Sequence, residues 1–385
     1  MDKRIIGLAT VDITDAEIDA VAKVLKSGKI SPGSVQREFE DYVANKHGMK
    51  YGTFVNSGQS ALHLSFEALK YEKDYQYIVC PATTYISTVF AAWNAGLGVK
   101  LVDVDSETYN MRDFSDINDK TAIMCPVNLM GLSANHPNYF NIPSGVAPVV
   151  EDNCESIFAP FSGYGDFMCL SFYAAHQITT GSGGMICTNS IERDRLIKSI
   201  CNHGRADSTN LYTADRNESY DKSKKFIFDK VGFSYKMGDY MAALGLVQAQ
   251  RSAEIIGKKV EVAHKLIDRL SIHSERIQLP TKIGNTFMNF PIVVKGRKTG
   301  LVNHLNDWQI ETRDLMPVLN QPIIQKELQK NIFRMVHTKN IIHRCRDLSV
   351  SESLLDSGFY IGCHQGMTDE DVEYVGEVFD AYFQA

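Results

Sequence analysis

The feature that most constrains this chain is an alternation of short apolar runs and longer amphipathic stretches between residues 52 and 188. Short runs rich in β-branched residues predict buried strands, and the stretches between them have the spacing of helices. Strands that alternate with helices predict an α/β fold around a largely parallel sheet, with sites at the strand ends. We expect strands at Gly52–Val55, Tyr77–Cys80, Val99–Val104, Ala122–Pro126, Ala147–Val150, Cys169–Phe172 and Met185–Thr188, with helices such as Ser60–Leu69 and Tyr85–Asn94 between them.

Helical patterns flank this region on both sides. A capping box at Thr14-Asp15-Ala16-Glu17 begins one helix, which carries Ile18, Val21, Val24 and Leu25 on one face and ends at Gly28. We expect a large domain over residues 1–250 and a smaller C-terminal α/β domain over residues 251–385, with a loop at Ala206–Lys225. The other expected elements are helices at Ser34–His47, Asp239–Arg251, Ala253–Leu270, Gly300–Asp307 and Asp369–Phe383, and strands near Thr286–Val294 and Gln309–Arg313.

Composition argues against several classes of protein. The chain has 40 Lys+Arg against 46 Asp+Glu, which lacks the basic excess of a nucleic-acid surface. No apolar run approaches the roughly 20 residues of a membrane-spanning helix, and the N-terminus lacks the apolar stretch of a secretory signal. The eight cysteines are spread singly and form no CxxC pair, so we expect free thiols and no metal site. These features predict a cytoplasmic protein.

The first candidate site follows the strand at Gly52–Val55. Asn56-Ser57-Gly58-Gln59-Ser60 stands between that strand and a helix, and free amides at a helix N-terminus bind anions when a glycine lets the ligand approach. An ordinary strand-to-helix turn explains the same residues. The next strand leads to Pro81-Ala82-Thr83-Thr84-Tyr85, where Tyr85 either stacks on a flat ring or simply packs.

Two further segments bring acid and base groups to strand ends. Val149-Val150-Glu151-Asp152-Asn153-Cys154-Glu155 places carboxylates after an apolar strand, where burial without partners is costly. A buried Asp152 is able to hold a heteroaromatic nitrogen protonated, although a helix N-cap explains it as well. The last segment runs from Ser171 to His176 and on to a glycine-rich stretch. A lone histidine is more often structural than catalytic, but this one lies among small residues near the expected cleft.

In this order, the four segments resemble the DegT/DnrJ/EryC1/StrS family of nucleotide-sugar aminotransferases, which have the aspartate aminotransferase (fold type I) architecture. The resemblance covers residues 53–365. It implies pyridoxal 5'-phosphate or pyridoxamine 5'-phosphate as the cofactor, and a homodimer whose two active sites share residues. Further segments that carry the resemblance are Asn202-His203-Gly204-Arg205, Gly232–Met237, Ala242–Gly245 and Ile361–Gln365.

The resemblance also assigns roles by position. The amides of Gly58 and Gln59 and the hydroxyl of Ser171 would bind the cofactor phosphate. Tyr85 would stack on the ring, Asp152 would pair with the ring nitrogen, and Glu155 would reach the 3-hydroxyl. Ser234 would reach the phosphate of the neighbouring subunit's cofactor, at a position where the family usually has asparagine, with Lys236 in place of a companion arginine.

His176 occupies the position at which family enzymes carry the lysine that bonds the cofactor. Imidazole forms no stable imine with an aldehyde, but it transfers protons near neutral pH. The same replacement marks the nucleotide-sugar 3-dehydratase branch of the family. The variety with a [2Fe–2S] cluster is disfavoured because no cysteine lies between Cys201 and Cys345, so the resemblance is to the cluster-free GDP-4-keto-6-deoxy-D-mannose 3-dehydratase branch. Ala174 and Gln177 stand where this branch commonly has proline and a second histidine.

The resemblance therefore implies C3 deoxygenation of a nucleotide-linked 4-keto-6-deoxy sugar, as in the synthesis of dideoxy sugars for lipopolysaccharide O-antigens. His176 would be the base and L-glutamate the amino donor. Glutamate carboxylates need cationic anchors; Arg313 is the first candidate, equally explained as a surface arginine, followed by His203 and Arg205.

Two alternatives stay open. One is an aminotransferase-like enzyme that acts on another substrate without a lysine-bound cofactor. The other is a cofactor-binding protein without catalytic activity. Retention of Asp152, Glu155 and Ser171 weighs against the second alternative, because a degenerate site would be expected to lose its ring-binding groups as well.

Overall fold

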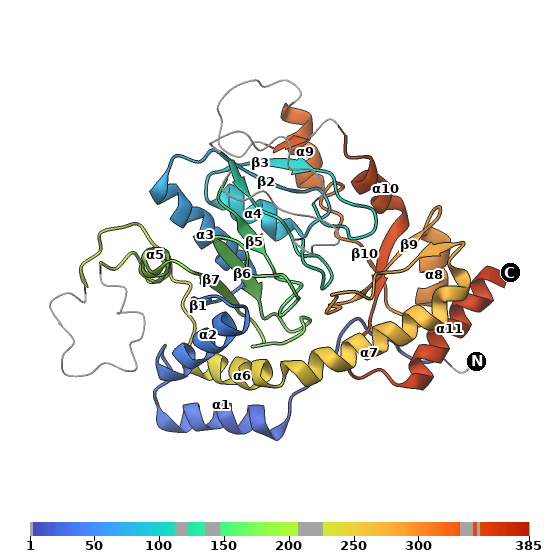
Figure 1. Ribbon diagram of the computed structural model, residues 1–385, viewed down its shortest axis with the longest axis horizontal. Coiled ribbons are helices and arrows are strands. Elements are labelled where there is room, and N and C mark those ends of the chain that lie inside the picture. The colour runs from blue at the N-terminus through green and yellow to red at the C-terminus, as the bar shows by residue number, and fades with distance from the viewer. Residues whose placement is uncertain are drawn as a thin grey trace.

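The computed structural model describes residues 3–111, 122–134, 147–206, 226–331, 342–344 and 347–384. Figure 1 shows a larger α/β unit on the left and a smaller one on the right. The consecutive helices α6 (Asp239–Gln250) and α7 (Ser252–Leu270) run beneath both units and connect them. The α/β class predicted from the alternating pattern is confirmed.

The large unit contains two four-stranded sheets that meet edge to edge. Parallel bridges from Met124 to Val149 and from Val127 to Asp152 join them. β7 runs antiparallel to both of its neighbours and the other pairs are parallel, so the combined sheet is largely parallel. The strand order is β1 (Tyr51–Val55), β7 (Gly184–Thr188), β6 (Phe167–Ser171) and β5 (Val150–Asp152) in one sheet, and β4 (Ala122–Met124), β2 (Tyr77–Pro81), β3 (Gly98–Val102) and β11 (Ile342–Arg344) in the other.

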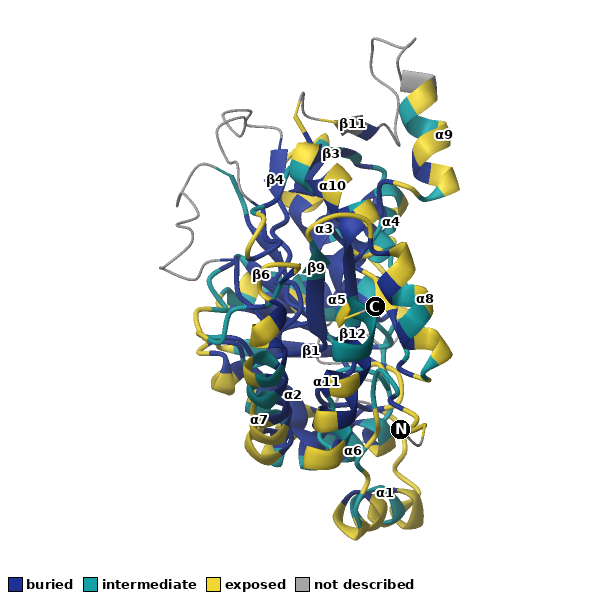
Figure 2. Cartoon of the chain, turned by 90° about the vertical axis from the view of Figure 1, so that its right-hand side faces the viewer, coloured by how far each residue is buried: buried dark blue, intermediate teal, exposed yellow. Residues whose placement is uncertain are grey.

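Helices cover both faces of this sheet, as a parallel sheet requires. Successive side chains of a strand point to opposite faces. Phe167 of β6 packs in an apolar cluster with residues of α3 (Gly58–Glu72), α4 (Ile86–Asn94) and α5 (Ile191–Cys201). Met168, the next residue, packs on the other face with Phe39 of α2 (Ser34–Lys46). The strands are accordingly among the most deeply buried parts of the chain (Figure 2).

β5 is displaced along the chain from its predicted position. We expected Ala147–Val150, whereas the strand spans Val150–Asp152. The apolar run ends at Val150, but Glu151 and Asp152 continue the strand because hydrogen-bond donors from Asn128 and Thr88 compensate for their burial. The displacement makes Asp152 the last residue of β5, paired with Cys169 of β6.

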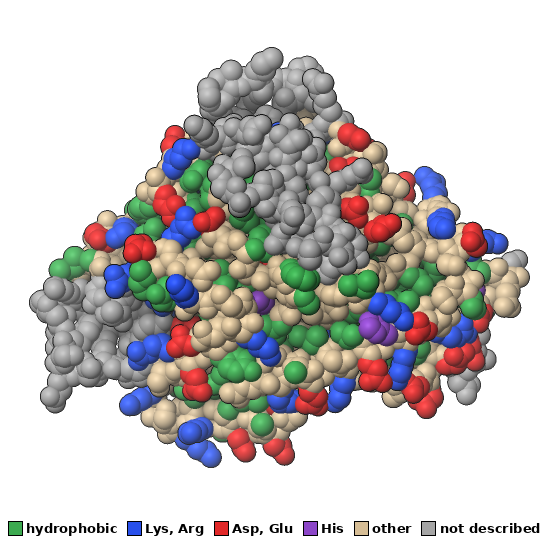
Figure 3. Space-filling model, in the orientation of Figure 1, with side chains coloured by type: hydrophobic (Ala, Val, Ile, Leu, Met, Phe, Trp, Pro, Cys, Tyr) green, Lys and Arg blue, Asp and Glu red, His purple; other side chains and the backbone are tan. Residues whose placement is uncertain are grey.

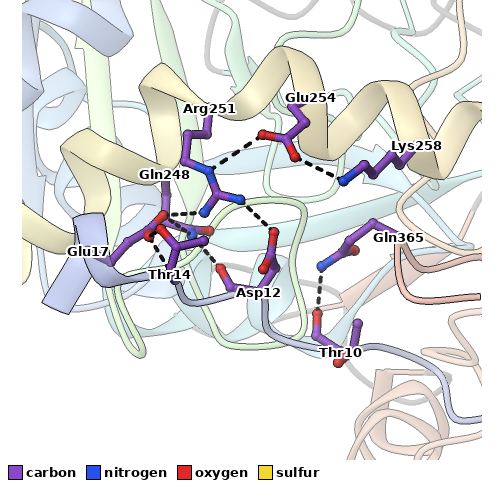
Figure 4. Close-up of polar contacts among 9 residues, drawn as sticks. All are labelled: Thr10, Asp12, Thr14, Glu17, Gln248, Arg251, Glu254, Lys258 and Gln365. Carbon is purple, nitrogen blue, oxygen red and sulfur yellow. Dashed lines mark hydrogen bonds and ion pairs between the residues drawn. The ribbon is translucent and has the colours of Figure 1, made fainter.

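α1 (Asp15–Ser27) begins at the predicted capping box of Thr14 and Glu17, and only part of its apolar face is buried. Val24 is buried, whereas Ile18 and Leu25 are 56% and 54% exposed. The buried anchor is instead Glu17, whose carboxylate accepts hydrogen bonds from Gln248 and Arg251 at the junction of α6 and α7 (Figure 4). A polar network therefore helps to attach this helix.

The small unit is an antiparallel sheet in the order β10-β12-β9-β8, flanked by helices. The predicted strands here are longer than the observed ones, since Thr286 and Phe287 instead belong to a loop that hydrogen-bonds Gly131 of the large unit. The elements are β8 (Ile277–Gln278), β9 (Phe290–Val294), α8 (Thr299–Asp307), β10 (Arg313–Asp314), β12 (Gly358–Ile361), α11 (Asp369–Gln384) and a short 3₁₀ turn at Ser271–His273.

Two segments cross between the units. β11 follows α9 (Pro322–Asn331), pairs with β3, and places Ile342 in the largest core of the large unit. Ile6, near the N-terminus, bridges Ile310 and packs in the core of the small unit. α10 (Ser349–Ser357) then leads into β12. The predicted domain boundary at residue 250 stays a prediction. Because β11 pairs with β3, residues after this boundary contribute to the large unit as well as to the small one.

The surface carries no clear single-sign patch on the face seen in Figure 3, where acidic and basic side chains are interspersed. Among the described helices, none is long and apolar enough to cross a membrane. Seven cysteines are free thiols, and Cys345 lies outside the described residues. The predicted loop Ala206–Lys225 also lies outside them, apart from Ala206.

Candidate cofactor site at the strand ends

The N-terminus of α3 presents unused amides beside β6. Ser57 caps this helix and accepts a hydrogen bond from the Ser60 amide, so the amides of Gly58 and Gln59 keep no partner inside the helix. A Cβ placed on Gly58 would lie 2.9 Å from the Ser171 Cβ and 2.7 Å from the Cys154 Sγ. Glycine is therefore required for this close approach, which places two amides and the Ser171 hydroxyl together as an anion site.

Asp152 is held at the end of β5 by a side chain of α4. Thr88 Oγ1 donates to Asp152 Oδ2 at 2.8 Å, and the Cys154 amide donates to Oδ1 at 3.3 Å. The carboxyl is 5% exposed, and burial raises its pKa. A carboxylate has more acceptor positions than these two bonds occupy, so Asp152 is still able to accept a further N–H from a bound ring.

Glu151 and Glu155 are both buried, but they differ in their partners. Glu151 accepts hydrogen bonds from Asn128 Nδ2 and from the amides of Gly163 and Tyr164, so it organises a loop. Glu155 accepts one, from the Met130 amide at 3.1 Å. Burial raises the pKa of each glutamate to about 7. Glu155 therefore has acceptor capacity left for a ligand, whereas Glu151 is committed to the fold.

His176 is bonded through one ring nitrogen. Its Nδ1 lies 2.7 Å from the Cys154 carbonyl oxygen. Because a carbonyl only accepts, Nδ1 carries the proton and Nε2 keeps its lone pair in the neutral ring. Burial, and secondarily the charge of Lys259, lowers the pKa of His176 to about 4, against the effect of the Cys154 bond. The ring is therefore neutral near pH 7 and is able to accept a proton at Nε2.

These contacts converge on the segment that follows β5. Cys154 touches the position of Gly58, bonds His176 through its carbonyl and bonds Asp152 through its amide. The structure thus brings Gly58, Asp152, Ser171 and His176 together, with Glu155 on the same segment. Among the described residues, no group of His, Cys, Asp and Glu has a metal-binding arrangement.

Tyr85 and Gln59 lie at the edge of this arrangement. Tyr85 precedes α4 and is 60% exposed, one helical turn before Thr88. Gln59 Oε1 accepts a hydrogen bond from Ser87 Oγ, also on α4. The first turns of α3 and α4 therefore lie side by side, and Tyr85 is free to cover a ring.

Arg313 lies in the small unit, beside Tyr360. It begins β10, is paired with Tyr360 in β12, and forms an ion pair with Glu311 at 2.6 Å. The pKa of Tyr360 is raised to about 12 by burial and then by the charge of Glu155, while Arg313 acts in the opposite direction. Tyr360 therefore lies within electrostatic reach of both Glu155 and Arg313.

The remaining predicted residues gather at a different place. Lys236 Nζ donates to Ser234 Oγ at 3.2 Å and lies 3.3 Å from His203 Nε2. Arg205 stacks over the rings of Phe226 and Phe228. No hydrogen bond links these side chains to Asp152, Ser171 or His176 within the described part of the chain. In the single chain, Ser234, His203 and Arg205 are thus not part of the strand-end arrangement.

Sequence reasoning missed three residues of the site. Thr88 was detectable as a hydroxyl side chain in the first turn of the helix that follows Tyr85. Lys259 was detectable as a lysine within the apolar stripe of a long helix. Tyr360 carried no signal, since its role depends on the docking of β12 beside the large unit.

The donor set fits a phosphorylated pyridine cofactor. Two helix amides and a hydroxyl suit its phosphate, and a buried carboxylate suits its ring nitrogen. Only a glycine at position 58 lets α3 approach Ser171 this closely, which places the amides and the hydroxyl together around such a phosphate. Fold and site together define a pyridoxal phosphate-dependent enzyme of the aspartate aminotransferase-like class.

Comparison with known proteins agrees with this class. A GDP-perosamine synthase of Escherichia coli O157:H7 is 28% identical, with 96% of each chain covered. A GDP-4-keto-6-deoxy-D-mannose 3-dehydratase of Escherichia coli O55:H7 is 26% identical, over 96% of this chain and 98% of the relative. A crystal structure of GDP-4-keto-6-deoxymannose-3-dehydratase with a trapped PLP-glutamate geminal diamine matches at a TM-score of 0.83 and 25% identity, covering 97% and 99% of the two chains.

The family model for the DegT/DnrJ/EryC1/StrS aminotransferase family matches residues 11–380. The chain belongs to this family, which confirms the resemblance found in the sequence, the fold and the pyridoxal phosphate cofactor. The individual roles given above to Gly58, Gln59, Tyr85, Asp152, Glu155, Ser171, His176 and Ser234 stay predictions.

Proposed function

We propose that this protein is a 3-dehydratase that removes the C3 hydroxyl of a nucleotide-linked 4-keto-6-deoxy sugar, such as GDP-4-keto-6-deoxymannose. The proposed amino donor is L-glutamate, which recharges the cofactor as its pyridoxamine form. One observation carries the proposal. At the position of the family's lysine stands His176, with Nδ1 bonded to the Cys154 carbonyl and Nε2 left with its lone pair.

The residues of this chain divide the work between binding and proton transfer. The amides of Gly58 and Gln59 and the Ser171 hydroxyl would hold the phosphate, and Asp152 would hold the ring nitrogen protonated. Once bound, the cofactor supplies an amine and an electron-withdrawing ring. His176 Nε2 would accept the proton whose removal drives loss of the C3 hydroxyl. A lysine here would compete for the cofactor aldehyde, so its replacement favours elimination over repeated amino transfer.

Arg313 is the proposed anchor for a glutamate carboxylate. Its guanidinium is more than half exposed and bonds Glu311, an ion pair that a carboxylate ligand is able to replace. The charges of Arg313 and Glu155 both act on Tyr360, which supports a position of Arg313 near the cofactor site. His203 and Arg205 are second candidates, because they lie with Ser234 in the cluster around Lys236.

We further propose a homodimer. Ser234 is exposed, and the nearby side chains Phe226, Ile227, Phe228 and Val231 are 71%, 48%, 48% and 83% exposed. Exposed apolar side chains close together in a chain are typical of a protein interface. Contact with a second copy would bring Ser234 to the cofactor phosphate of that copy.

An aminotransferase is the second candidate, because a GDP-perosamine synthase is 28% identical over nearly the whole chain. The two functions differ in the product. We would incubate the purified protein with pyridoxamine phosphate and GDP-4-keto-6-deoxymannose, with and without glutamate, and measure ammonia and sugar mass. Ammonia release with loss of the C3 oxygen supports the dehydratase, whereas an amino group gained by the sugar contradicts it. If no 4-keto sugar nucleotide is converted, the remaining interpretation is a cofactor-binding protein without catalytic activity.

A further inference from the structure

A loop of the small unit is docked on the large unit at Gly131. This loop, residues 285–288, precedes β9, and its Phe287 packs in the core of the small unit. The amide of Thr286 donates to the Gly131 carbonyl at 2.9 Å, and the Thr286 hydroxyl donates to the same oxygen at 3.1 Å. A Cβ on Gly131 would lie 2.3 Å from the Phe287 nitrogen, so only glycine allows the two backbones to approach this closely.

The docking point keeps two backbone conformations that residues other than glycine seldom adopt. Met130 has a φ of 54° and Phe287 a φ of 45°, both in the left-handed region. The Met288 amide donates to the Met130 carbonyl at 3.3 Å. Left-handed residues of this kind cost free energy, persist only where their surroundings hold them, and collect at functional sites. The docked loop is therefore a candidate for a functional role.

The residues on which the loop docks hold the segment that carries Glu155. The Met130 amide donates to Glu155 Oε2 at 3.1 Å. The Gly131 amide donates to Ser156 Oγ at 3.0 Å, and Ser156 is fully buried. The position of the loop therefore bears on the Glu155 carboxyl and on the segment around it.

A second contact joins the loop to the segment that carries His176. Gln177 Nε2 donates to Thr286 Oγ1 at 3.0 Å. Gln177 is 2% exposed and its Oε1 has no partner within the described residues, so its orientation depends on this bond. Gln177 directly follows His176, whose Nδ1 is bonded to the carbonyl of Cys154, two residues before Ser156. The hydroxyl of Thr286 therefore links the two segments that hold the imidazole.

We propose that Thr286 is a positioning residue for the reaction, which aligns His176 and Glu155 when the small unit is docked on the large unit. Its hydroxyl is at once a donor to Gly131 and an acceptor from Gln177, which an apolar side chain of the same shape cannot be. A small displacement of a base from its working position is costly in rate. The inference rests on the proposed function in naming His176 as the base. The hydrogen bonds themselves belong to the protein without cofactor or sugar.

Turnover of three variants tests the proposal. Thr286→Val keeps the shape and removes both bonds of the hydroxyl, whereas Thr286→Ser keeps the hydroxyl. Thr53→Val is the matched control, because Thr53 is 1% exposed and its hydroxyl bonds Asp194 at 3.3 Å inside the large unit. We expect Thr286→Val to lower kcat for sugar conversion roughly tenfold to a hundredfold and to change the KM values less than about threefold. Thr286→Ser should recover most of the kcat, and Thr53→Val should keep it.

Amide hydrogen exchange in the cofactor-free protein gives a readout that does not need the reaction. In Thr286→Val, the amides of Met130 and Gly131 should exchange about tenfold faster, because the contact that holds these residues is weakened. The amides of β2, in the core of the large unit, should change no more than they do in Thr53→Val.

Gln177→Met tests the same link from its other end and leaves the contact between Thr286 and Gly131 in place. It should also lower kcat, and the double variant with Thr286→Val should be no slower than Thr286→Val alone, because both changes remove one shared bond. If Thr286→Val does not fold, Gln177→Met decides alone. A reduced kcat then supports the proposal, and an unchanged kcat overturns it.

A wild-type kcat in folded Thr286→Val would overturn the proposal. So would faster exchange that is equal throughout the core, since that result would show a purely structural threonine. If exchange rises at Met130 and Gly131 as expected but the wild-type protein dehydrates no sugar, the inference about Thr286 stands and the proposed function fails.

Discussion

The residues predicted for the cofactor site form two sets, which differ in burial and in their partners. The strand-end group contains Gly58, Asp152, Glu155, Ser171 and His176, which are buried or half-buried and are connected through the segment around Cys154. The surface group contains Tyr85, His203, Arg205, Ser234 and Arg313, which are exposed or half-buried and interact mainly with their own neighbours.

The difference in burial and partners indicates which residues of the site one chain holds in place without a ligand or a second chain. Thr88 and the Met130 amide donate hydrogen bonds to Asp152 and Glu155, and the Cys154 carbonyl accepts one from His176, so these side chains are preorganised as catalysis requires. The surface group is held by its own neighbours, such as Glu311 beside Arg313 and Lys236 beside Ser234, and we propose that a bound ligand or a second chain completes it. Substitutions in the first group should therefore affect the chemical step, and those in the second should affect binding.

The largest effect is expected for His176→Asn. Asparagine is able to keep a bond to the Cys154 carbonyl but accepts no proton, so the rate of sugar conversion should fall on the order of a thousandfold. Turnover with saturating glutamate and sugar nucleotide measures this loss, with cofactor affinity as the control. A rate within tenfold of wild type would remove His176 from the chemistry.

Asp152→Asn should follow in size. An amide does not keep the ring nitrogen protonated, and the loss of one preorganised charge lowers turnover on the order of 10²–10³-fold. Thr88→Val, which removes the hydrogen bonds of this hydroxyl to Asp152 and Thr84 but keeps the carboxylate, should lower turnover less. Equal losses in both variants would mean that the position of the carboxylate matters more than its charge.

Arg313→Lys tests the surface group. Lysine keeps the charge but not the bidentate geometry, so the KM for glutamate should rise roughly 10–100-fold while kcat changes little. Arg344→Lys is the control, since Arg344 is also exposed and also pairs with a glutamate, Glu352. If both variants keep the wild-type KM, the anchor lies elsewhere, and His203 and Arg205 become the residues to change.

Glu155→Gln and Glu151→Gln compare two buried carboxyls in their effect on stability. Burial raises the pKa of each to about 7 from 4.5, so the folded chain binds these protons more tightly than the unfolded chain. The free energy of unfolding therefore falls as the pH rises from 4.5 to about 7. Each replacement removes one titrating group and should reduce this decrease by on the order of 1–2 kcal/mol. Glu151→Gln should in addition lose about 2 kcal/mol at either pH, because glutamine has a single acceptor oxygen whereas the donors of Asn128, Gly163 and Tyr164 use both oxygens of the carboxylate. Urea unfolding at both ends of the window measures the difference, and identical behaviour of the two variants would refute the distinction between them.

Ser234→Ala should have the smallest effect. Loss of one hydroxyl donor to a phosphate is worth about 1 kcal/mol, so cofactor affinity should fall less than tenfold. Fluorescence titration of the cofactor measures it, with Ser182→Ala as an exposed control. A loss beyond a hundredfold would place Ser234 among the primary phosphate ligands.

The sequence predicted the strand-end group better than its surroundings. Gly58, Asp152, Ser171 and His176 each lie at or after the end of a strand. The ends of strands in a largely parallel sheet meet at one edge, so their convergence was foreseeable. The exact extent of β5 was not, because the partners that allow Glu151 and Asp152 to be buried come from Asn128 and Thr88 in other segments.

Features that depend on tertiary packing were the ones missed. The exposed face of α1 contradicted its amphipathic pattern, since Glu17 rather than Ile18 attaches the helix to Arg251. Lys259 stands in the apolar stripe of α7, which is a signal in the sequence, but the extent of its burial depends on the two cores that meet along this helix. The spacing of apolar residues in the sequence shows which side of a helix or strand is apolar. What packs against that side is decided by contacts between elements, which the spacing does not show.

The central claim is that this site is built to hold pyridoxal phosphate by contacts alone. It is tested by mixing the protein with equimolar cofactor, reducing with borohydride and measuring the mass of the chain and its peptides. A non-covalent site predicts no attached cofactor in the wild type and one cofactor on residue 176 in His176→Lys. A cofactor fixed to Lys259, or to any other lysine of the wild-type site, would contradict the claim.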